Sequence, residues 1–183
     1  MRLGPPDPTS FDDEQRRVHD LIASGPRGRV RGPLAIWLHR PALAEAAQKL
    51  GAYCRYGSSL EPRLSELAIL TMATVWQSEF EWWAHKPIAL KAGLGADIVE
   101  ALRSGAPPAF PDRETETVHA VTIALSTQRR LTDALYAQAD AVLGPDRLVD
   151  LVGLCGYYTL ISMTLNAFEV PLPEGERAEL TGL

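Results

Sequence analysis

The sequence contains little cysteine. Its two cysteines, Cys54 and Cys155, lie far apart along the chain. They form neither a Cys-x-x-Cys pair nor a Cys/His spacing of the kind that binds zinc, so no thiol metal site or disulfide framework is indicated. Isolated cysteines of this kind are typical of reduced thiols, and we expect a cytoplasmic protein.

Long hydrophobic segments are also missing. No window holds the ~18 uninterrupted apolar residues that a membrane-spanning helix needs. The longest apolar run, residues 148–168, is broken by Asp150, by glycines and by polar residues. The N-terminus lacks the apolar core of a secretory signal. We therefore expect no membrane partner.

Positive charge is not concentrated in one strong patch. The formal net charge is -5, and the densest cationic stretch consists of Arg27, Arg29 and Arg31. Glycines and prolines surround these arginines, so we interpret residues 25–33 as an exposed loop. Without a basic footprint on the rest of the chain, we expect no nucleic-acid partner.

Strand patterns are absent too, since no segment alternates apolar and polar residues. The sequence therefore predicts an all-α fold. Its length fits a single domain over residues 1–183. Three prolines near the N-terminus predict a mobile lead-in over residues 1–9, and a second Pro-containing segment predicts an extended tail over residues 170–183.

Two consecutive helices contain the candidate chemistry. Residues 62–76 are apolar nearly all round, which predicts a central helix, and a helix over residues 79–92 follows. Glu81 and His85 lie one turn apart on the second helix, where a carboxylate orients an imidazole for general acid or base catalysis near neutral pH. The alternative is structural, because Ser78-x-x-Glu81 is also a capping box and helical histidines are often structural.

A family resemblance rests on three segments of this region. They are Arg63-x-x-Glu66-Leu-Ala-Ile-Leu, Glu81-x-x-x-His85 and Ala89-Leu-Lys-Ala-Gly93-Leu. Together they resemble the carboxymuconolactone decarboxylase and alkylhydroperoxidase D-like superfamily over about half of the chain. The resemblance implies a compact bundle of short helices whose central hairpin holds the site, and a homo-oligomer, either a trimer or a hexamer. An excess of apolar helix surface also favours association.

The resemblance also indicates which branch of the superfamily to consider. In its peroxidase branch, a Cys-x-x-Cys pair occupies the positions of Ser78 and Glu81, flanked by a glutamate at Glu66 and a histidine at His85. Serine and glutamate cannot exchange disulfides. The Glu81-x-x-x-His85 spacing instead resembles the decarboxylase branch, which transfers protons without a cofactor. A peroxidase-like oxidoreductase is therefore disfavoured.

Roles for individual residues follow from these considerations. We expect Glu81 and His85 to be catalytic and Glu66 to orient or tune them, although an acid near a helix N-terminus needs no function. Six further residues are candidates for contacts with the substrate. The Ser78 hydroxyl could donate to a developing enolate, and the phenols of Tyr157 and Tyr158 and the amide of Asn166 need polar partners within an apolar helix. His39 and the cation Arg63, with Arg55 as its alternative, complete the set.

Our first hypothesis is a cofactor-independent lyase, decarboxylase or isomerase that transfers protons on a small organic acid or lactone. The alternative is a non-catalytic, oligomeric, small-molecule-binding protein on the same scaffold. The two differ in one feature, because a binding protein has no need of a desolvated proton-transfer pair at Glu81 and His85. No further His or Glu-x-x-His motif completes a metal site, so we expect no metal ligands and no cofactor.

Overall fold

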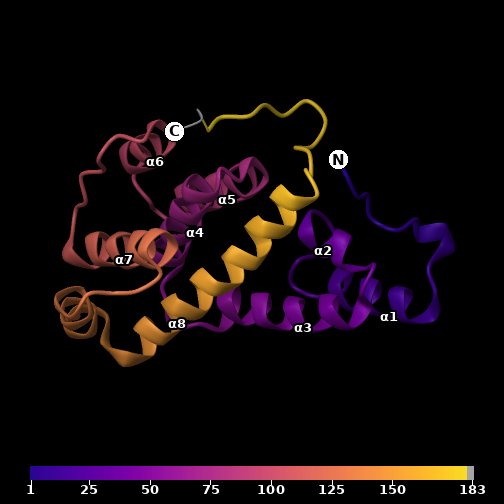
Figure 1. Ribbon diagram of the computed structural model, residues 1–183, viewed down its shortest axis with the longest axis horizontal. Coiled ribbons are helices and arrows are strands. Elements are labelled where there is room, and N and C mark those ends of the chain that lie inside the picture. Colours follow the sequence, from indigo (N-terminus) through magenta and orange to yellow (C-terminus); the bar gives the residue numbers. More distant parts are fainter. Residues whose placement is uncertain (181–183) are drawn as a thin grey trace.

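The computed structural model describes residues 1–180, and it contains helices and no strand within that range. The all-α prediction is confirmed. Figure 1 shows the arrangement of the helices. In chain order they are α1 (Asp13–Ala23), α2 (Pro33–Trp37), α3 (Pro41–Ala52), α4 (Pro62–Trp76), α5 (Glu79–Lys91), α6 (Ala96–Ser104), α7 (Arg113–Ile123) and α8 (Asp133–Ala167).

Helix α4 is the centre of the bundle, as its sequence predicts. Pro62 occupies the first turn, where a missing amide hydrogen has no cost, and every residue from 64 to 74 is buried. The helix packs against α5, α7 and α8. A tight turn at Gln77, which adopts a left-handed conformation with φ 50°, leads directly into α5. The two helices form the central hairpin that holds the candidate site.

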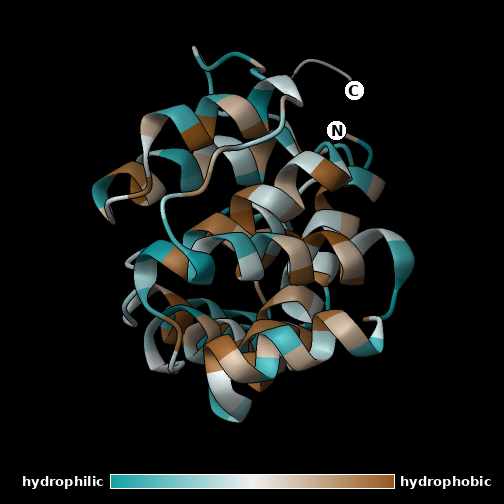
Figure 2. Ribbon diagram, turned by 90° about the vertical axis from the view of Figure 1, so that its left-hand side faces the viewer, coloured by the Kyte–Doolittle hydropathy of each residue, from teal (hydrophilic) through white to brown (hydrophobic). Residues whose placement is uncertain are grey.

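Helix α8 crosses the bundle beside this hairpin (Figure 1). Gly144 has non-helical angles, with φ 74° and ψ 168°, so the helix kinks there. By length and composition alone α8 is able to span a membrane, yet 61% of its most apolar window is buried within the fold. That degree of burial is typical of a core helix. Hydrophobic and hydrophilic residues are interspersed along the helices (Figure 2).

The start of α5 differs from the sequence prediction. Ser78 is the N-cap residue, but its side chain makes no capping hydrogen bond, so the predicted capping box is wrong. At the capped helices α1, α7 and α8 the N-cap ψ lies between 158° and 172°, whereas Ser78 has ψ 88°. Its hydroxyl is therefore not directed at the free amides of the first turn. Glu81 has no capping role that would explain its burial.

Both terminal segments lie against the helices. The backbone amide of Arg2 donates to the carbonyl of Phe168, and the tail returns from α8 toward α6 (Figure 1). Near its end, the amides of Glu179 and Leu180 donate to the Glu79 carboxylate at 2.9 Å. The last three positions of the predicted tail, 181–183, lie outside the described residues. The single domain and the mobile lead-in stay predictions.

Candidate active site

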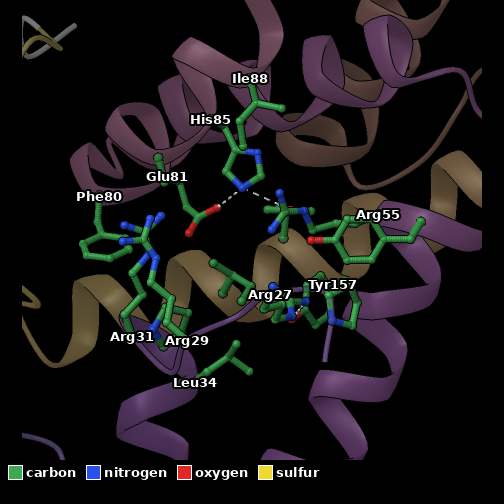
Figure 3. Close-up of a pocket in the computed structure, with 16 residues that line it drawn as sticks. Arg27, Arg29, Arg31, Leu34, Arg55, Phe80, Glu81, His85, Ile88 and Tyr157 are labelled. Atoms are coloured by element: carbon green, nitrogen blue, oxygen red, sulfur yellow. Dashed lines mark hydrogen bonds and ion pairs between the residues drawn. The ribbon is translucent and has the colours of Figure 1, made fainter. Parts of the chain in front are cut away.

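A cavity of about 280 Å³ lies between α5, the second half of α8, the loop over residues 25–33, and the π-helical turn Tyr53–Gly57. Figure 3 shows its lining side chains, with Glu81 and His85 facing a group of arginines. The lining residues used below are Arg27, Arg29, Arg31, Arg55, Glu81, His85, Tyr157 and Tyr158. Segments far apart in sequence therefore form one polar chamber.

His85 is the residue around which this chamber is organised. Its Nδ1 lies 2.7 Å from Glu66 Oε2, and its Nε2 lies 3.4 Å from Glu81 Oε2 and 3.3 Å from the Tyr158 hydroxyl. All three partners are at least nine-tenths buried. Because an ionised Glu66 only accepts hydrogen bonds, Nδ1 carries a hydrogen and Nε2 is directed toward the cavity. The ring is thus held in the orientation that a proton carrier needs.

Glu81 is a buried carboxyl group with few polar partners. Its side chain is 4% exposed, and Oε2 has no hydrogen-bond partner among the described residues. Burial raises the pKa of Glu81, while His85 and Arg55 oppose that rise only in part. A carboxyl group in this environment keeps its proton to higher pH than an exposed glutamate does. Glu81 is therefore suited to donate a proton next to Nε2 of His85.

The two tyrosines of α8 form the wall opposite α5. Burial raises the pKa of Tyr157 to about 12, and burial also raises the pKa of Tyr158 well above its usual value. Both phenols therefore stay protonated at neutral pH and act as hydrogen-bond donors. The Tyr158 ring meets the His85 ring edge to face at 5.3 Å between centroids, which fixes its hydroxyl beside Nε2.

The cavity also gathers four arginines, which are Arg27, Arg29, Arg31 and Arg55. Among the described residues none of them is paired with a carboxylate within 4.0 Å. Burial lowers the pKa of Arg31, and the neighbouring charges of Arg29 and Arg55 lower it further. Cations held together without counterions favour an anion between them. The charge of the chamber therefore indicates a negatively charged ligand.

Close packing holds one of these arginines in place. The guanidinium of Arg27 donates to the Tyr157 hydroxyl at 3.4 Å, and its buried Nε has no hydrogen-bond partner in the described part of the chain. Both groups lie against Gly51 near the end of α3, where any added Cβ would overlap the Tyr157 hydroxyl and the Arg27 guanidinium. A side chain at position 51 would therefore displace the ends of these two cavity side chains.

The structure brings together five of the predicted site residues, Glu66, Glu81, His85, Tyr157 and Tyr158, but it places the other four away from the cavity. Ser78 precedes His85 by seven residues, about 10 Å along α5, and its buried hydroxyl lies in a separate depression near the end of α8. Asn166 donates to the carbonyl of Trp76, eight residues or about 12 Å beyond Tyr158.

His39 and Arg63 also have other partners. The exposed His39 ring contacts the carbonyl of Gly4 at 2.8 Å. Arg63 donates to the Thr115 hydroxyl and pairs with Asp112 at 3.2 Å. Arg63 is therefore not the cation of the cavity, contrary to the sequence prediction. Arg55, the alternative, lines the cavity.

Sequence reasoning missed the role of the loop over residues 25–33. We interpreted its arginines as solvent-exposed, whereas three of them reach the cavity. The gathering of three arginines within five residues was the available signal, but the loop is irregular, so their spacing does not predict where the side chains point. No pattern in the sequence predicts the contact of Gly51 with Tyr157 and Arg27.

The two cysteines lie outside this chamber. Both are free and buried, and burial raises the pKa of Cys54 and that of Cys155, the latter to about 11. Neither is an activated thiolate at neutral pH. Within residues 1–180, no group of three or more His, Cys, Asp or Glu side chains is arranged to hold a metal ion.

Known proteins match both the core and the fold. Residues 41–122 match the model of the carboxymuconolactone decarboxylase family, a segment that includes Arg55, Glu66, Glu81 and His85. The structure is also similar to the crystal structure of an alkylhydroperoxidase AhpD core, an uncharacterized peroxidase-related protein from Ralstonia eutropha JMP134. The TM-score is 0.74 at 12% identity, over 94% of this chain and 92% of that chain.

No functionally curated protein matches the sequence significantly. At 12% identity the structural likeness shows the fold alone. The family match covers the hairpin and the turn that carries Arg55, while the arginine loop and the tyrosines of α8 lie outside it. Residues 41–122 are thus similar to the carboxymuconolactone decarboxylase family, and the fold is similar to that of the alkylhydroperoxidase AhpD core.

Proposed function

We propose that this protein is a cofactor-independent lyase, decarboxylase or isomerase that transfers a proton on a small organic acid or lactone. One observation carries the proposal. The His85 ring lies between Glu66 and the buried Glu81, whose Oε2 accepts no hydrogen bond from residues 1–180. Both groups lie at the wall of a cavity with four arginines that pair with no carboxylate in the same range. This arrangement combines a proton-transfer pair with a site for an anion.

The arginines supply the binding part of the proposal. A guanidinium binds a carboxylate through two parallel hydrogen bonds, which fixes the orientation of the substrate as well as its charge. Arg55 is the arginine most strongly influenced by the acids of the site. Burial lowers its pKa, but Tyr158, Tyr56, Glu66 and Glu81 together raise it more. A carboxylate on Arg55 therefore lies close to His85 and Glu81.

In an isomerisation, Nε2 of His85 removes a proton from the carbon next to a carbonyl, and the C–H electron pair enters an enolate. Glu81 then donates its proton to the distal carbon of the conjugated system, and His85 returns a proton to Glu81. In a decarboxylation, the C–C electron pair enters the enolate as CO2 leaves, and the carbon takes its proton from Glu81. His85 takes a proton from solvent at Nε2 and passes it to the Glu81 carboxylate, 3.4 Å away, which restores the acid. Both routes therefore use His85 and Glu81, one to take up a proton and the other to donate one.

The enolate oxygen also needs stabilisation. Tyr158 keeps its proton because burial raises its pKa, and its hydroxyl lies 3.3 Å from the proton-transfer nitrogen. A fixed donor beside the position where negative charge accumulates stabilises the transition state more than the ground state. We assign to Tyr158 the donor role that the sequence analysis gave to Ser78.

The alternative, a non-catalytic binding protein, predicts no desolvated proton-transfer pair. The raised pKa of Glu81, caused by burial, and its position 3.4 Å from Nε2 of His85 favour the enzyme. Peroxidase chemistry needs a reactive thiolate. Burial raises the pKa of both cysteines, and the positions of the missing thiols hold Ser78 and Glu81.

The test is turnover on a panel of small unsaturated organic acids and lactones. We expect His85→Ala and Glu81→Gln each to lower turnover by roughly 10²- to 10⁴-fold, the usual contribution of a positioned acid or base. The double variant should be little worse than the worse single variant, because the two residues act as a unit. Ser78→Ala is the control and should retain activity. Wild-type turnover in His85→Ala contradicts the mechanism.

A further inference from the structure

Arg55 lies in an unusual segment of backbone. It occupies the middle of the π-helical turn Tyr53–Gly57, which follows α3 directly. Such turns are rare and are frequently found at functional sites. The direction of the Arg55 side chain therefore depends on whatever holds this turn in place.

One carboxylate on α8 binds the first residue of that turn and a residue just beyond its end. Asp150 Oδ1 accepts from the hydroxyl of Tyr53 at 2.7 Å, and Tyr53 begins the π-helical turn. Asp150 Oδ2 accepts from the backbone amide and the hydroxyl of Ser59, both at 2.6 Å. Ser59 lies two residues beyond the end of the turn. Three hydrogen bonds to one ionised group clamp the segment that presents Arg55.

The clamp is a nearly buried negative charge that only neutral groups contact. Asp150 is 9% exposed, and no Lys, Arg or His lies within 4.0 Å of it in the described part of the chain. Burial alone raises the pKa of Asp150, but the hydrogen bonds from Ser59 and Tyr53 outweigh burial and lower that pKa. The carboxylate is therefore ionised and accepts hydrogen bonds at both oxygens.

Asp150 lies on the same rigid helix as the opposite wall of the cavity. Tyr157 follows it by seven residues, two helical turns, and therefore shares its face of α8, and Tyr158 contacts His85. The helix thus sets the distance between the arginine on the turn and the proton-transfer pair. We propose that Asp150 is a positioning residue, which acts through Tyr53 and Ser59 to direct Arg55 at the anionic group of the substrate.

This inference rests on one part of the proposed function, which is that the cavity binds an anion. Citrate is a suitable probe, and isothermal titration calorimetry of the full chain measures its affinity. We expect Arg55→Gln to weaken citrate binding. Asp150→Asn keeps the size of the side chain but leaves one acceptor oxygen in place of two, so it cannot accept from Tyr53 and Ser59 through separate oxygens. We expect it to weaken citrate binding by roughly tenfold, or about 1.4 kcal/mol.

A double-variant cycle separates positioning from general destabilisation. If Asp150 acts through Arg55, then Asp150→Asn weakens citrate binding in the wild-type chain but has little further effect in Arg55→Gln. Gln138→Leu is the matched stability control, because it removes a hydrogen bond between α8 and α7 at the other end of α8. It should lower the melting temperature and leave citrate affinity unchanged.

The outcomes are distinguishable. Equal losses from Asp150→Asn in both backgrounds, or no loss in either, overturn the positioning role while the anion site stands. An Arg55→Gln variant that binds citrate as tightly as the wild type overturns the use of Arg55 in the proposed function. A wild-type chain that binds no citrate overturns both.

Discussion

Replacing Glu81 with glutamine tests the electrostatics of the site without any knowledge of the substrate. The side chain is 4% exposed, one of its oxygens lacks a hydrogen-bond partner, and burial raises its pKa above the ordinary 4.5. In the unfolded chain the group titrates normally. Folding therefore binds a proton between pH 4.5 and the raised pKa, so the wild type loses stability as pH rises through that window.

The Glu81→Gln variant has no such titration. Relative to the wild type it should gain stability as pH rises above about 4.5, by at most ~1.4 kcal/mol for each pH unit, and the gain should level off above the raised pKa. For a chain of this size that is roughly 4 °C in melting temperature per pH unit. Thermal unfolding followed by circular dichroism from pH 4 to pH 8 measures the difference.

Glu100→Gln is the matched control for this experiment. Glu100 is exposed, and its hydrogen bonds to Arg103 lower its pKa. Its contribution to stability is therefore present above pH 4.5 and is lost only as pH falls further. The difference between this variant and the wild type should stay constant from pH 5 to pH 8. A Glu81→Gln variant that becomes progressively less stable than the wild type toward neutral pH would refute the reasoning, since that is the sign of an ionised Glu81 paired with a charged His85.

Three further predictions concern the thiols, the packing of the cavity and the assembly. Cys54→Ser and Cys155→Ser, singly or together, should leave turnover near that of the wild type, because burial raises the pKa of both thiols; a large loss in a folded double variant would revive a redox role. Gly51→Ala should weaken citrate binding, since the new methyl group displaces Tyr157 and Arg27; unchanged affinity would show that these two residues have room to shift. We also propose a trimer or hexamer, because α8 exposes Val149, Val152 and Met163, and light scattering that gives a monomer at micromolar concentration would remove this proposal.

The central hairpin was predictable because its signals are local. The apolar run of α4, the proline that opens it and the Glu81-x-x-x-His85 spacing lie within 30 residues of one another, and the structure places Glu66 against His85. The tyrosines of α8 were predictable for another reason. A phenol in an apolar helix needs a polar partner, and Tyr158 finds one in His85.

The rest of the site depends on contacts that no local pattern specifies. Arg63 is near Glu66 in sequence, but its side chain binds Asp112 and Thr115, about fifty positions later in the chain. These contacts hold Arg63 away from the cavity. The loop over residues 25–33 is irregular, so nothing in its sequence gives the direction in which it packs. Asp150 interrupts an apolar run, and its partners Tyr53 and Ser59 lie more than ninety residues earlier. Its function depends on a π-helical turn that hydrophobic periodicity does not predict.

The most direct test of the central claim is the incorporation of solvent deuterium at carbon. Wild-type protein and His85→Ala are incubated in D2O with the panel of organic acids and lactones, and the products and recovered acids are analysed by NMR. The proposed proton transfer predicts deuterium at the carbon next to a carbonyl, or at the carbon that has lost CO2, with wild-type protein, and roughly 10²- to 10⁴-fold slower incorporation with His85→Ala. Equal incorporation by both proteins, or none by the wild type with any member of the panel, would contradict it.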